Sequence, residues 1–407
     1  MKKITFVIPS RNNLEFLKLA YKSIRELGKE PFEGYGYTHT QHEILVLNDA
    51  STDGTQEWID SLEDEDLITH HNPGPERIGI VGMFDKGIEM ARTDIIFAFH
   101  ADMVAAPNLD KHILKHLEKG TVVSATRVEP PLHPDGPEKV LMNFGIEVED
   151  FDYDKFCDWT TKPIDSTGGY QPKHNTLVTE GIFAPWCMYK EDYLAVGGHD
   201  ELFAPQSKED SDLFNRFILN GYKVLQTWEG LVYHFTSRGS RFNKHAGGGA
   251  GKNSEEWLYT TTKNMRNFIR KWGSIVKHDS LMKPIISPKY DIGFIIENCS
   301  SDLLAGLEPW CSTVYIDNDF IEAYIETEKS NTIMDLYNRV KPYDNEKNNE
   351  ILIEIDANTF TEQDYNYLQQ LPPIINDSGE PGEFELGNLK IIINSLTTYE
   401  KELICVS

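Results

Sequence analysis

The chain has 407 residues, of which 40% are hydrophobic and 26% are charged. This composition is typical of a folded globular protein, and the length favours more than one domain. The net charge of −26 argues against general binding to nucleic acids or to anionic membranes. An anionic ligand therefore needs a metal ion or a local group of arginines.

The five cysteines are widely spaced and form no C-x-x-C pair, so the sequence indicates neither a disulfide framework nor a zinc site. The apolar run at residues 4–9 is too short for a signal peptide, and no stretch reaches the length of a transmembrane helix. These features predict a cytoplasmic protein that is not integral to a membrane.

Strands and helices alternate in the first hundred residues. The predicted strands are 4–8, 43–47, 67–69 and 94–99, and the predicted helices begin at Leu14 and cover 56–62 and 81–91. This order predicts an α/β fold with a mostly parallel, Rossmann-like sheet flanked by helices. In such sheets, ligands bind at the carboxyl ends of the strands.

The pattern is less regular further along the chain. Residues 130–172 accumulate Pro, Gly and Asp, which predicts an irregular insertion over the sheet edge. A helix follows at 210–219, and strands follow at 223–228 and 231–235. The glycine-rich segment 246–253 ends in Asn rather than Ser or Thr, so it does not fit a phosphate-binding loop. It is either a loop that orders over a substrate or a simple linker.

The alternation of strands and helices restarts after residue 287. The predicted strands are 292–296, 313–316, 351–355 and 389–393. We therefore expect two domains, residues 1–280 and 288–407, the second being a smaller α/β domain. This domain carries no motif for chemistry, and acceptor recognition, oligomer assembly and binding of another protein all remain open as its role.

Two acidic residues follow predicted strands. Asp49 can accept the imide hydrogen of a uracil ring, or its segment can be a plain helix N-cap. Asp102 follows the most apolar strand and reaches the same sheet edge. An oxygen-rich edge suits Mg²⁺ or Mn²⁺ completed by a substrate diphosphate, although an aspartate there is also common in turns.

Three further features have both a chemical and a structural interpretation. Glu209 and Asp210 open a predicted helix, as a general base or as residues favoured by the helix dipole. His234 lies in an apolar strand, as a Mn²⁺ ligand or as a core residue. Trp186 and Trp228 are either a platform for a sugar ring or buried core side chains.

The order of these motifs resembles the inverting glycosyltransferase family 2, which has the GT-A fold. The resemblance covers about residues 1–242. It rests on Ile8-Pro9 with Asn12 or Asn13, on Asn48-Asp49-Ala-Ser51-Thr-Asp53-Gly-Thr55, on His100-Ala101-Asp102, and on Gly197-Gly198-His199-Asp200-Glu201 followed by Glu209-Asp210-Ser211-Asp212.

The resemblance implies roles for individual residues. The implied donor-nucleotide site is Pro9, Ser10, Arg11, Asn13, Asp49, His100, Ala101, Asp102 and Arg238. The implied catalytic residues are Asp210, as general base, and Glu209; the metal ligands are Asp102 and His234, and the acceptor contacts are Trp186 and Glu201. The implied reaction moves a sugar from a nucleotide-diphosphate sugar, with UDP favoured, to a hydroxyl of a glycan or other acceptor, with Mn²⁺ or Mg²⁺ as cofactor.

Three residues depart from the family pattern. Asn48 and His100 replace acidic residues, and Arg11 stands where an aromatic residue is common. They keep open an alternative, a non-catalytic protein that binds a nucleotide sugar or a glycan on a degenerate transferase domain. A nucleotidyltransferase is disfavoured, because the first strand–helix turn has no glycine-rich phosphate loop.

Overall fold

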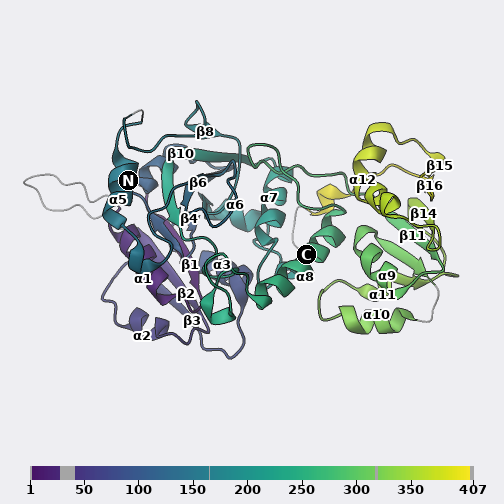
Figure 1. Ribbon diagram of the computed structural model, residues 1–407, viewed down its shortest axis with the longest axis horizontal. Coiled ribbons are helices and arrows are strands. Elements are labelled where there is room, and N and C mark those ends of the chain that lie inside the picture. Colours follow the sequence, from purple (N-terminus) through teal and green to yellow (C-terminus); the bar gives the residue numbers. More distant parts are fainter. Residues whose placement is uncertain (1, 28–41, 165, 317–319, 404–407) are drawn as a thin grey trace, which may run out of the picture. The chain divides into compact units, whose positions relative to one another are not determined.

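The computed structural model describes residues 2–27, 42–164, 166–316 and 320–403 (Figure 1). The chain forms two compact units, Met1–Thr260 with His278–Pro284 and Thr261–Lys277 with Ile285–Cys405. The division passes through helix α8 (Glu255–Trp272). Cys405 lies outside the described residues, and the other four cysteines are free thiols.

The larger unit contains a mixed sheet with strand order β3-β2-β1-β4-β9-β6-β10-β5. The strands are β1 Ile4–Ser10, β2 Glu43–Asp49, β3 Leu67–Asn72, β4 Ile95–Ala98, β5 Met103–Ala105, β6 Thr121–Glu129, β7 Lys139–Leu141, β8 Val178–Thr179, β9 Trp186–Tyr189 and β10 Lys223–His234. The first four strands in the sheet are parallel, as are β6 and β10, and β9 runs antiparallel between β4 and β6. The sequence pattern predicted the parallel part but not β6 or β9.

Helices cover both faces of this sheet. The helices α1 (Leu14–Arg25), α2 (Thr55–Asp60) and α4 (Leu109–Leu114) contribute to one core, and α3 (Gly79–Met90), α6 (Lys190–Ala195) and α7 (Glu209–Leu219) contribute to the other. Alternate side chains of one strand enter opposite cores, so Phe6 and Ile8 pack on the first and Val7 on the second. Because both faces are covered, every residue of β2 is buried.

The predicted insertion over the sheet edge is packed. It contains β7 and the helix α5 (Tyr153–Thr161). A third core joins it to β10, in which Phe144 and Phe156 contact Tyr233 at ring-centroid distances of 5.9 and 5.6 Å. The aromatic side chains therefore attach this segment to the sheet, although its sequence pattern predicted an irregular structure.

Two loops at the carboxyl edge of the sheet are bonded to each other. The side chain of Asn12 accepts a hydrogen bond from the backbone N–H of Thr52 at 2.7 Å, and the backbone N–H of Asn12 donates to Ser51 Oγ at 3.0 Å. Asp53 accepts from the N–H of Leu14, the first residue of α1, at 2.9 Å. The capping residues in the second loop thus also fix the first loop.

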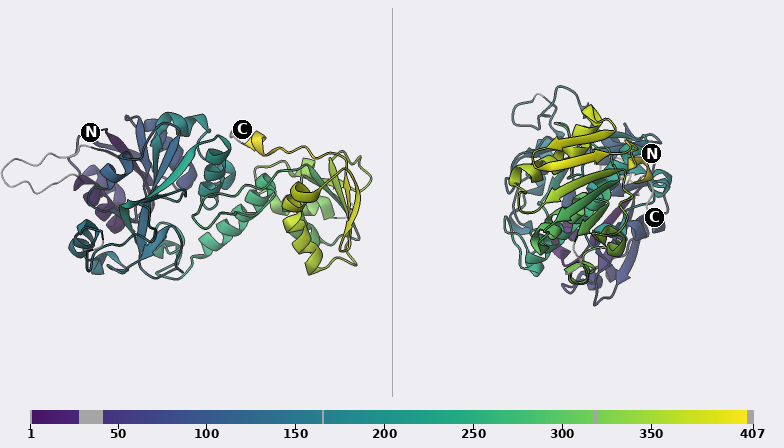
Figure 2. Two further views of the ribbon diagram at one scale, coloured as in Figure 1. Left: turned by 90° about the horizontal axis from the view of Figure 1, so that it is seen from above. Right: turned by 90° about the vertical axis from the view of Figure 1, so that its right-hand side faces the viewer.

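The smaller unit has its own sheet, with strand order β13-β12-β11-β14-β16-β15 (Figure 2). The strands are β11 Ile292–Glu297, β12 Thr313–Ile316, β13 Val340–Pro342, β14 Ile351–Asp356, β15 Gly382–Leu386 and β16 Leu389–Ile393, and the helices are α9 Ser301–Leu307, α10 Ile321–Glu328, α11 Leu336–Arg339 and α12 Glu362–Ser378. The first four strands in this order are parallel to one another, and β16 is antiparallel to both of its neighbours, β14 and β15. Among the described residues, none of the helices combines the length and apolar character needed to cross a bilayer.

A buried ion cluster joins three segments of the smaller unit. The fully buried Glu308 carboxylate lies 2.6 Å from Arg270 Nη2 and 2.5 Å from Arg339 Nε, and it accepts a hydrogen bond from Tyr324 at 2.9 Å. Burial favours the protonated acid, but the two arginines outweigh it and lower the pKa of Glu308 to about 2. The ionised carboxylate therefore ties α8, α10 and α11 together.

We expect Glu308→Gln to lower the unfolding free energy of the smaller unit by about 3 kcal/mol. The partly buried Arg339 and the buried Arg270 both lose a carboxylate partner, and Arg270 keeps its pair with Glu328. Urea unfolding measures this change. The matched control is Glu326→Gln, which removes the same charge from an exposed pair with Lys329 and should change stability by less than about 0.5 kcal/mol. Equal effects of the two variants would contradict a stabilising role for the cluster.

Candidate functional site

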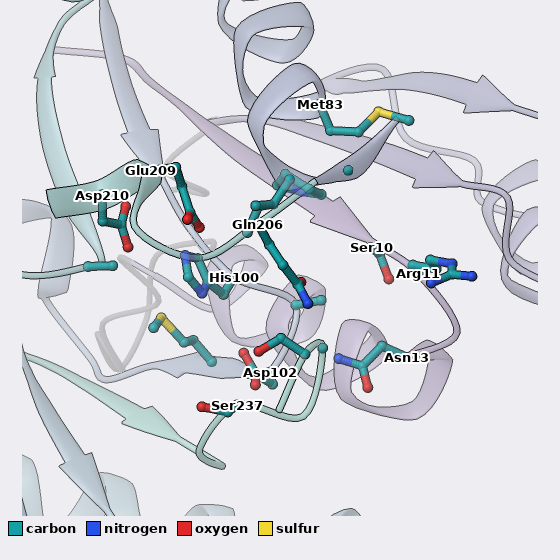
Figure 3. Close-up of a pocket in the computed structure, with 18 of the residues that line it drawn as sticks. Ser10, Arg11, Asn13, Met83, His100, Asp102, Gln206, Glu209, Asp210 and Ser237 are labelled. Atoms are coloured by element: carbon teal, nitrogen blue, oxygen red, sulfur yellow. The ribbon is translucent and has the colours of Figure 1, made fainter. Parts of the chain in front are cut away.

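A cavity of about 280 Å³ opens at the carboxyl ends of β1, β2 and β4 (Figure 3). Most of the site residues predicted from the sequence line it, namely Pro9, Ser10, Arg11, Asn13, Asp49, His100, Ala101, Asp102, Glu209, Asp210 and His234. The tertiary structure therefore brings together segments that are more than two hundred residues apart in the sequence.

Three predicted site residues do not reach this cavity with their side chains. Trp186 is buried in the core, with Tyr193 and Phe217 at ring-centroid distances of 5.9 Å each, so it offers no face to a sugar. Glu201 is exposed at the start of a short 3-10 helix. The guanidinium of Arg238 donates to the carbonyls of Phe235 and Ile146, and this residue acts on the site through its backbone.

Asp102 and His234 form a pair that fits a metal ion. His234 Nε2 lies 3.6 Å from Asp102 Oδ2, and both side chains are buried. Ligand atoms of one ion lie about 2.1 Å from it, so two atoms at this separation can share an ion. Among the described residues, no group of three or more His, Cys, Asp or Glu side chains is arranged for a metal. Two protein ligands completed by a substrate diphosphate suit Mg²⁺ or Mn²⁺.

Glu129 lies behind His234 and was not predicted from the sequence. His234 Nδ1 donates to Glu129 Oε1 at 2.7 Å, the arrangement that orients many metal-binding histidines. Burial lowers the pKa of His234, but the carboxylates of Asp102 and Glu129 outweigh it and raise the pKa overall. A metal ion at His234 Nε2 would therefore have to displace this proton, because only the neutral imidazole is a metal ligand.

Glu129 is in turn held by two basic residues. Arg127 Nη1 lies 3.3 Å and Lys139 Nζ lies 3.0 Å from its carboxylate, and Arg127 also pairs with Glu138 at 2.6 Å. Burial favours the protonated form of Glu129, but Arg127, His234 and Lys139 outweigh it and lower its pKa. An acidic residue at the end of β6 is the signal that would have identified it, because Asp49 and Asp102 also follow strands.

The backbone after β10 is strained where it reaches the metal pair. Thr236 and Ser237 adopt φ of 69° and 55°, a left-handed conformation that is costly for residues other than glycine. This turn lets the N–H of Ser237 donate to His234 Nε2 at 3.2 Å and the N–H of Arg238 donate to Asp102 Oδ2 at 2.5 Å. The strained turn therefore holds both side chains in place. A metal ion at His234 Nε2 would have to replace the hydrogen bond from Ser237, because this nitrogen has a single lone pair.

A second strained turn precedes the carboxylates of α7. Ser207 and Lys208 have φ of 79° and 74°, and Glu209 follows them as the first residue of the helix. Burial, with a smaller contribution from Asp210, raises the pKa of Glu209 to about 8. Asp210 is partly exposed and also lines the cavity. Figure 3 shows His100 between these carboxylates and Asp102.

Several polar side-chain atoms around the cavity have no hydrogen-bond partner among the residues that the structure describes. They are Ser10 Oγ, Arg11 Nε, Asn13 Nδ2, Arg127 Nε and Glu209 Oε2, all buried. Buried polar groups in folded proteins are nearly always hydrogen-bonded. Their concentration in the lining of one cavity indicates a site that is completed by a polar ligand.

The carboxylate of Asp49 is already engaged by the protein. Its Oδ1 accepts from Ile78 N–H at 2.8 Å and from the side chain of Asn72 at 2.7 Å, and its Oδ2 accepts from Gly79 N–H at 2.8 Å. Gly79 has φ of 90°, and a Cβ there would lie 2.5 Å from Pro205. Asp49 therefore anchors the start of α3 beside the cavity, which the sequence did not reveal.

We expect Glu129→Gln to weaken Mn²⁺ binding about 10- to 100-fold, because the neutral amide orients and polarises His234 less well. Titration calorimetry with Mn²⁺ measures the affinity. Glu138→Gln is the matched control, since it removes a buried charge from the same cluster without contacting His234. Unchanged Mn²⁺ affinity in Glu129→Gln, with a normal melting temperature, would show that Glu129 has only a structural role.

A second prediction concerns pH. Because the pKa of Glu209 rises from 4.5 to about 8 on folding, the folded state binds this proton more tightly, and stability falls as pH rises through that window. Glu209→Gln removes the titration, so its melting temperature should rise relative to the wild type between pH 5 and pH 9. The control is the exposed Glu201→Gln, whose difference from wild type should not follow this trend. A constant difference for Glu209→Gln would contradict the burial argument.

Comparisons with known proteins give two family matches. Residues 5–174 match the model of glycosyl transferase family 2, and residues 180–241 match that of chondroitin N-acetylgalactosaminyltransferase. Curated proteins give no significant match.

Two solved structures show a distant similarity. One is GalNAc-T7 with UDP, GalNAc and Mn²⁺, at 12% identity and a TM-score of 0.44, covering 67% of this chain and 51% of that one. The other is the mannosyltransferase PcManGT from Pyrobaculum calidifontis in complex with GDP-Man and Mn²⁺, at 16% identity and a TM-score of 0.40, covering 66% and 63%. This chain thus spans less than two thirds of either protein.

The family matches agree with the order of motifs and with the α/β sheet whose polar strand ends meet at one edge. The larger unit of this chain therefore resembles the glycosyltransferases of family 2 over residues 5–174, and its mixed α/β sheet is the architecture expected of the GT-A fold.

Proposed function

We propose that the protein transfers a sugar from a nucleotide-diphosphate sugar to an acceptor hydroxyl, with inversion at the anomeric carbon. The observation that supports this proposal is that Asp102 and His234 meet the carboxylates Glu209 and Asp210 in one cavity. The unsatisfied polar atoms around the cavity support a polar ligand of nucleotide type. UDP is the favoured nucleotide, and Mn²⁺ or Mg²⁺ the favoured metal.

Asp102 and His234 would hold the metal ion, with Glu129 orienting the histidine. When bound, the ion would neutralise charge on the departing diphosphate. The chain itself contributes Arg127 at this end of the cavity, held between Glu129 and Glu138. In a protein with a net charge of −26, these cationic groups make an anionic donor tolerable.

Asp210 is the proposed general base. The acceptor oxygen forms a bond to the anomeric carbon while the bond from that carbon to the diphosphate oxygen breaks, and the hydroxyl proton passes to the Asp210 carboxylate. A single displacement of this kind inverts the anomeric configuration. Glu209 suits the base role less well, because it is buried and burial raises its pKa, which favours the protonated form.

Donor binding is tested by melting temperature against nucleotide diphosphates and nucleotide sugars, with and without Mn²⁺ or Mg²⁺. A ligand that binds the folded state at 100 times its Kd stabilises it by about 2.7 kcal/mol. We expect the largest shift with UDP or a UDP-sugar in the presence of metal. No shift with any nucleotide in a folded sample would overturn the proposed function.

Asp210→Asn should lower transfer at least about 100-fold, because the acceptor loses its base, while donor binding stays intact. Product formation from the identified donor measures transfer, and calorimetry measures binding. Asp60→Asn, at an exposed position on α2, provides a control with the same charge change. Loss of donor binding in Asp210→Asn would place this residue in the nucleotide site instead.

The alternative, a non-catalytic protein that binds a nucleotide sugar, predicts donor binding without hydrolysis or transfer. Asn48 does not itself favour that alternative, because its side chain has a structural task. It donates to Gln56 at 2.9 Å and accepts from Ser51 N–H at 3.2 Å. A cytoplasmic location, a glycan acceptor and assembly through the smaller unit are further proposals that cell fractionation, acceptor screening and light scattering would test.

A further inference from the structure

Two arginines line the cavity at some distance from the proposed chemistry. Arg11 and Arg77 both contribute to its lining, and Figure 3 shows Arg11 beside Ser10, on the opposite side from Asp210. Burial lowers the pKa of Arg77, and the charges that act on it are those of Glu256, Arg11 and Asp49. The cavity therefore has a basic end in addition to the end with the metal pair.

A single carboxylate oxygen holds both arginines. Glu256 Oε1 lies 2.7 Å from Arg77 Nη2 and 3.5 Å from Arg11 Nη1. The side chain of Arg77 is 17% exposed and that of Glu256 is 38% exposed, so the carboxylate approaches from the solvent side. Within the described part of the chain, the Nε of Arg11 has no hydrogen-bond partner. The basic end of the cavity thus contains the carboxylate of Glu256, and the Nε of Arg11 can still donate a hydrogen bond to a ligand.

A closed loop brings Glu256 to this position. The backbone carbonyl of Arg241 accepts a hydrogen bond from the N–H of Ser254 at 2.9 Å, and the side-chain Nε of Arg241 donates to Asn253 Oδ1 at 2.6 Å. The Arg241 guanidinium also lies 4.5 Å from the ring centroid of Trp257, which lines the cavity. The glycine-rich segment 246–253 lies within this loop, and Glu256 belongs to the first turn of α8 that follows it.

We propose that Arg77 and Arg11 form hydrogen bonds to oxygen atoms of the nucleotide in the sugar donor. We further propose that the Glu256 carboxylate competes with the nucleotide for these two arginines. The inference rests on the proposed function, because its ligand is the nucleoside diphosphate part of a sugar donor. A guanidinium binds carboxylate, phosphate and base carbonyl oxygens with the same N–H groups. A carboxylate held by both arginines therefore marks a place where a ligand oxygen binds, and its negative charge opposes the ligand.

The test uses the full chain with Mn²⁺ and the nucleoside diphosphate that most stabilises the wild type. Glu256→Gln keeps the shape of the side chain and removes its charge, so the nucleotide should bind about fivefold more tightly, the equivalent of one exposed ion pair. The matched control is Glu255→Gln, an exposed neighbour in the same helical turn, which should leave the affinity unchanged. Calorimetry measures both dissociation constants.

Arg77→Gln should weaken nucleotide binding about tenfold or more, because it removes a charged hydrogen-bond donor. When Arg77→Gln is already present, Glu256→Gln should increase nucleotide affinity less than it does in the wild type, because the Arg77 guanidinium that it would free is absent. If Arg77→Gln does not fold, Arg77→Lys keeps the charge without the planar fork and should show a smaller loss. Melting temperatures without nucleotide separate effects on folding from effects on binding.

Pyrophosphate and the complete nucleotide distinguish the source of the ligand oxygens. If Glu256→Gln also tightens pyrophosphate binding, the arginines bind phosphate oxygens. If it tightens only the complete nucleotide, they bind oxygens of the base or ribose. Both results support the inference.

Other outcomes would overturn it. In the first, the wild type binds nucleotide but Glu256→Gln binds it no more tightly than Glu255→Gln does. In the second, Arg77→Gln folds and binds nucleotide with wild-type affinity. Either would leave the proposed function standing. A wild type that binds no nucleoside diphosphate would instead remove the proposed function itself.

Discussion

The contact between His234 and Asp102 depends on where one long strand lies in the sheet. Strand β10 pairs with β6 on one side and with β5 on the other, and this register sets His234 opposite Met103. The same pairing places the end of β6 beside His234, so that Glu129 can accept its hydrogen bond. The proposed metal end of the cavity depends on this convergence of strand ends, whereas Glu209 and Asp210 come from the start of helix α7.

Strain is concentrated on the two segments that bring chemistry to the cavity. The left-handed residues Thr236 and Ser237 follow the histidine, and Ser207 and Lys208 precede the carboxylates of α7. Such conformations persist only where the surrounding structure enforces them. Here the hydrogen bonds from the first turn to Asp102 and His234 show what that enforcement achieves, namely fixed positions for both side chains before any ligand arrives.

The acidic character of the chain shapes how its basic residues are used. Arg127 is shared by Glu129 and Glu138, and Arg11 and Arg77 share Glu256. The cations that line the cavity are therefore already paired, and an anionic ligand gains only the difference between its own contacts and those it replaces. A metal ion at the proposed Asp102–His234 site would add positive charge to the cavity, and for this reason the proposal assigns the diphosphate to that end.

The alternating elements, the two sheets and most of the residues that line the cavity are predictable from the sequence, because hydrophobic periodicity and strand-end motifs are local properties. It did not reveal β6 and β9, and with them it missed Glu129. It suggested a sugar platform at Trp186 and a donor contact by Arg238, whereas the fold buries the first and points the second away. Neither Arg77 nor Glu256 was predicted as a site residue, because arginines in surface loops and glutamates in the first turn of a helix are common. Which side chains meet is set by strand order and by the packing of distant loops, and those are decided only when the tertiary structure forms.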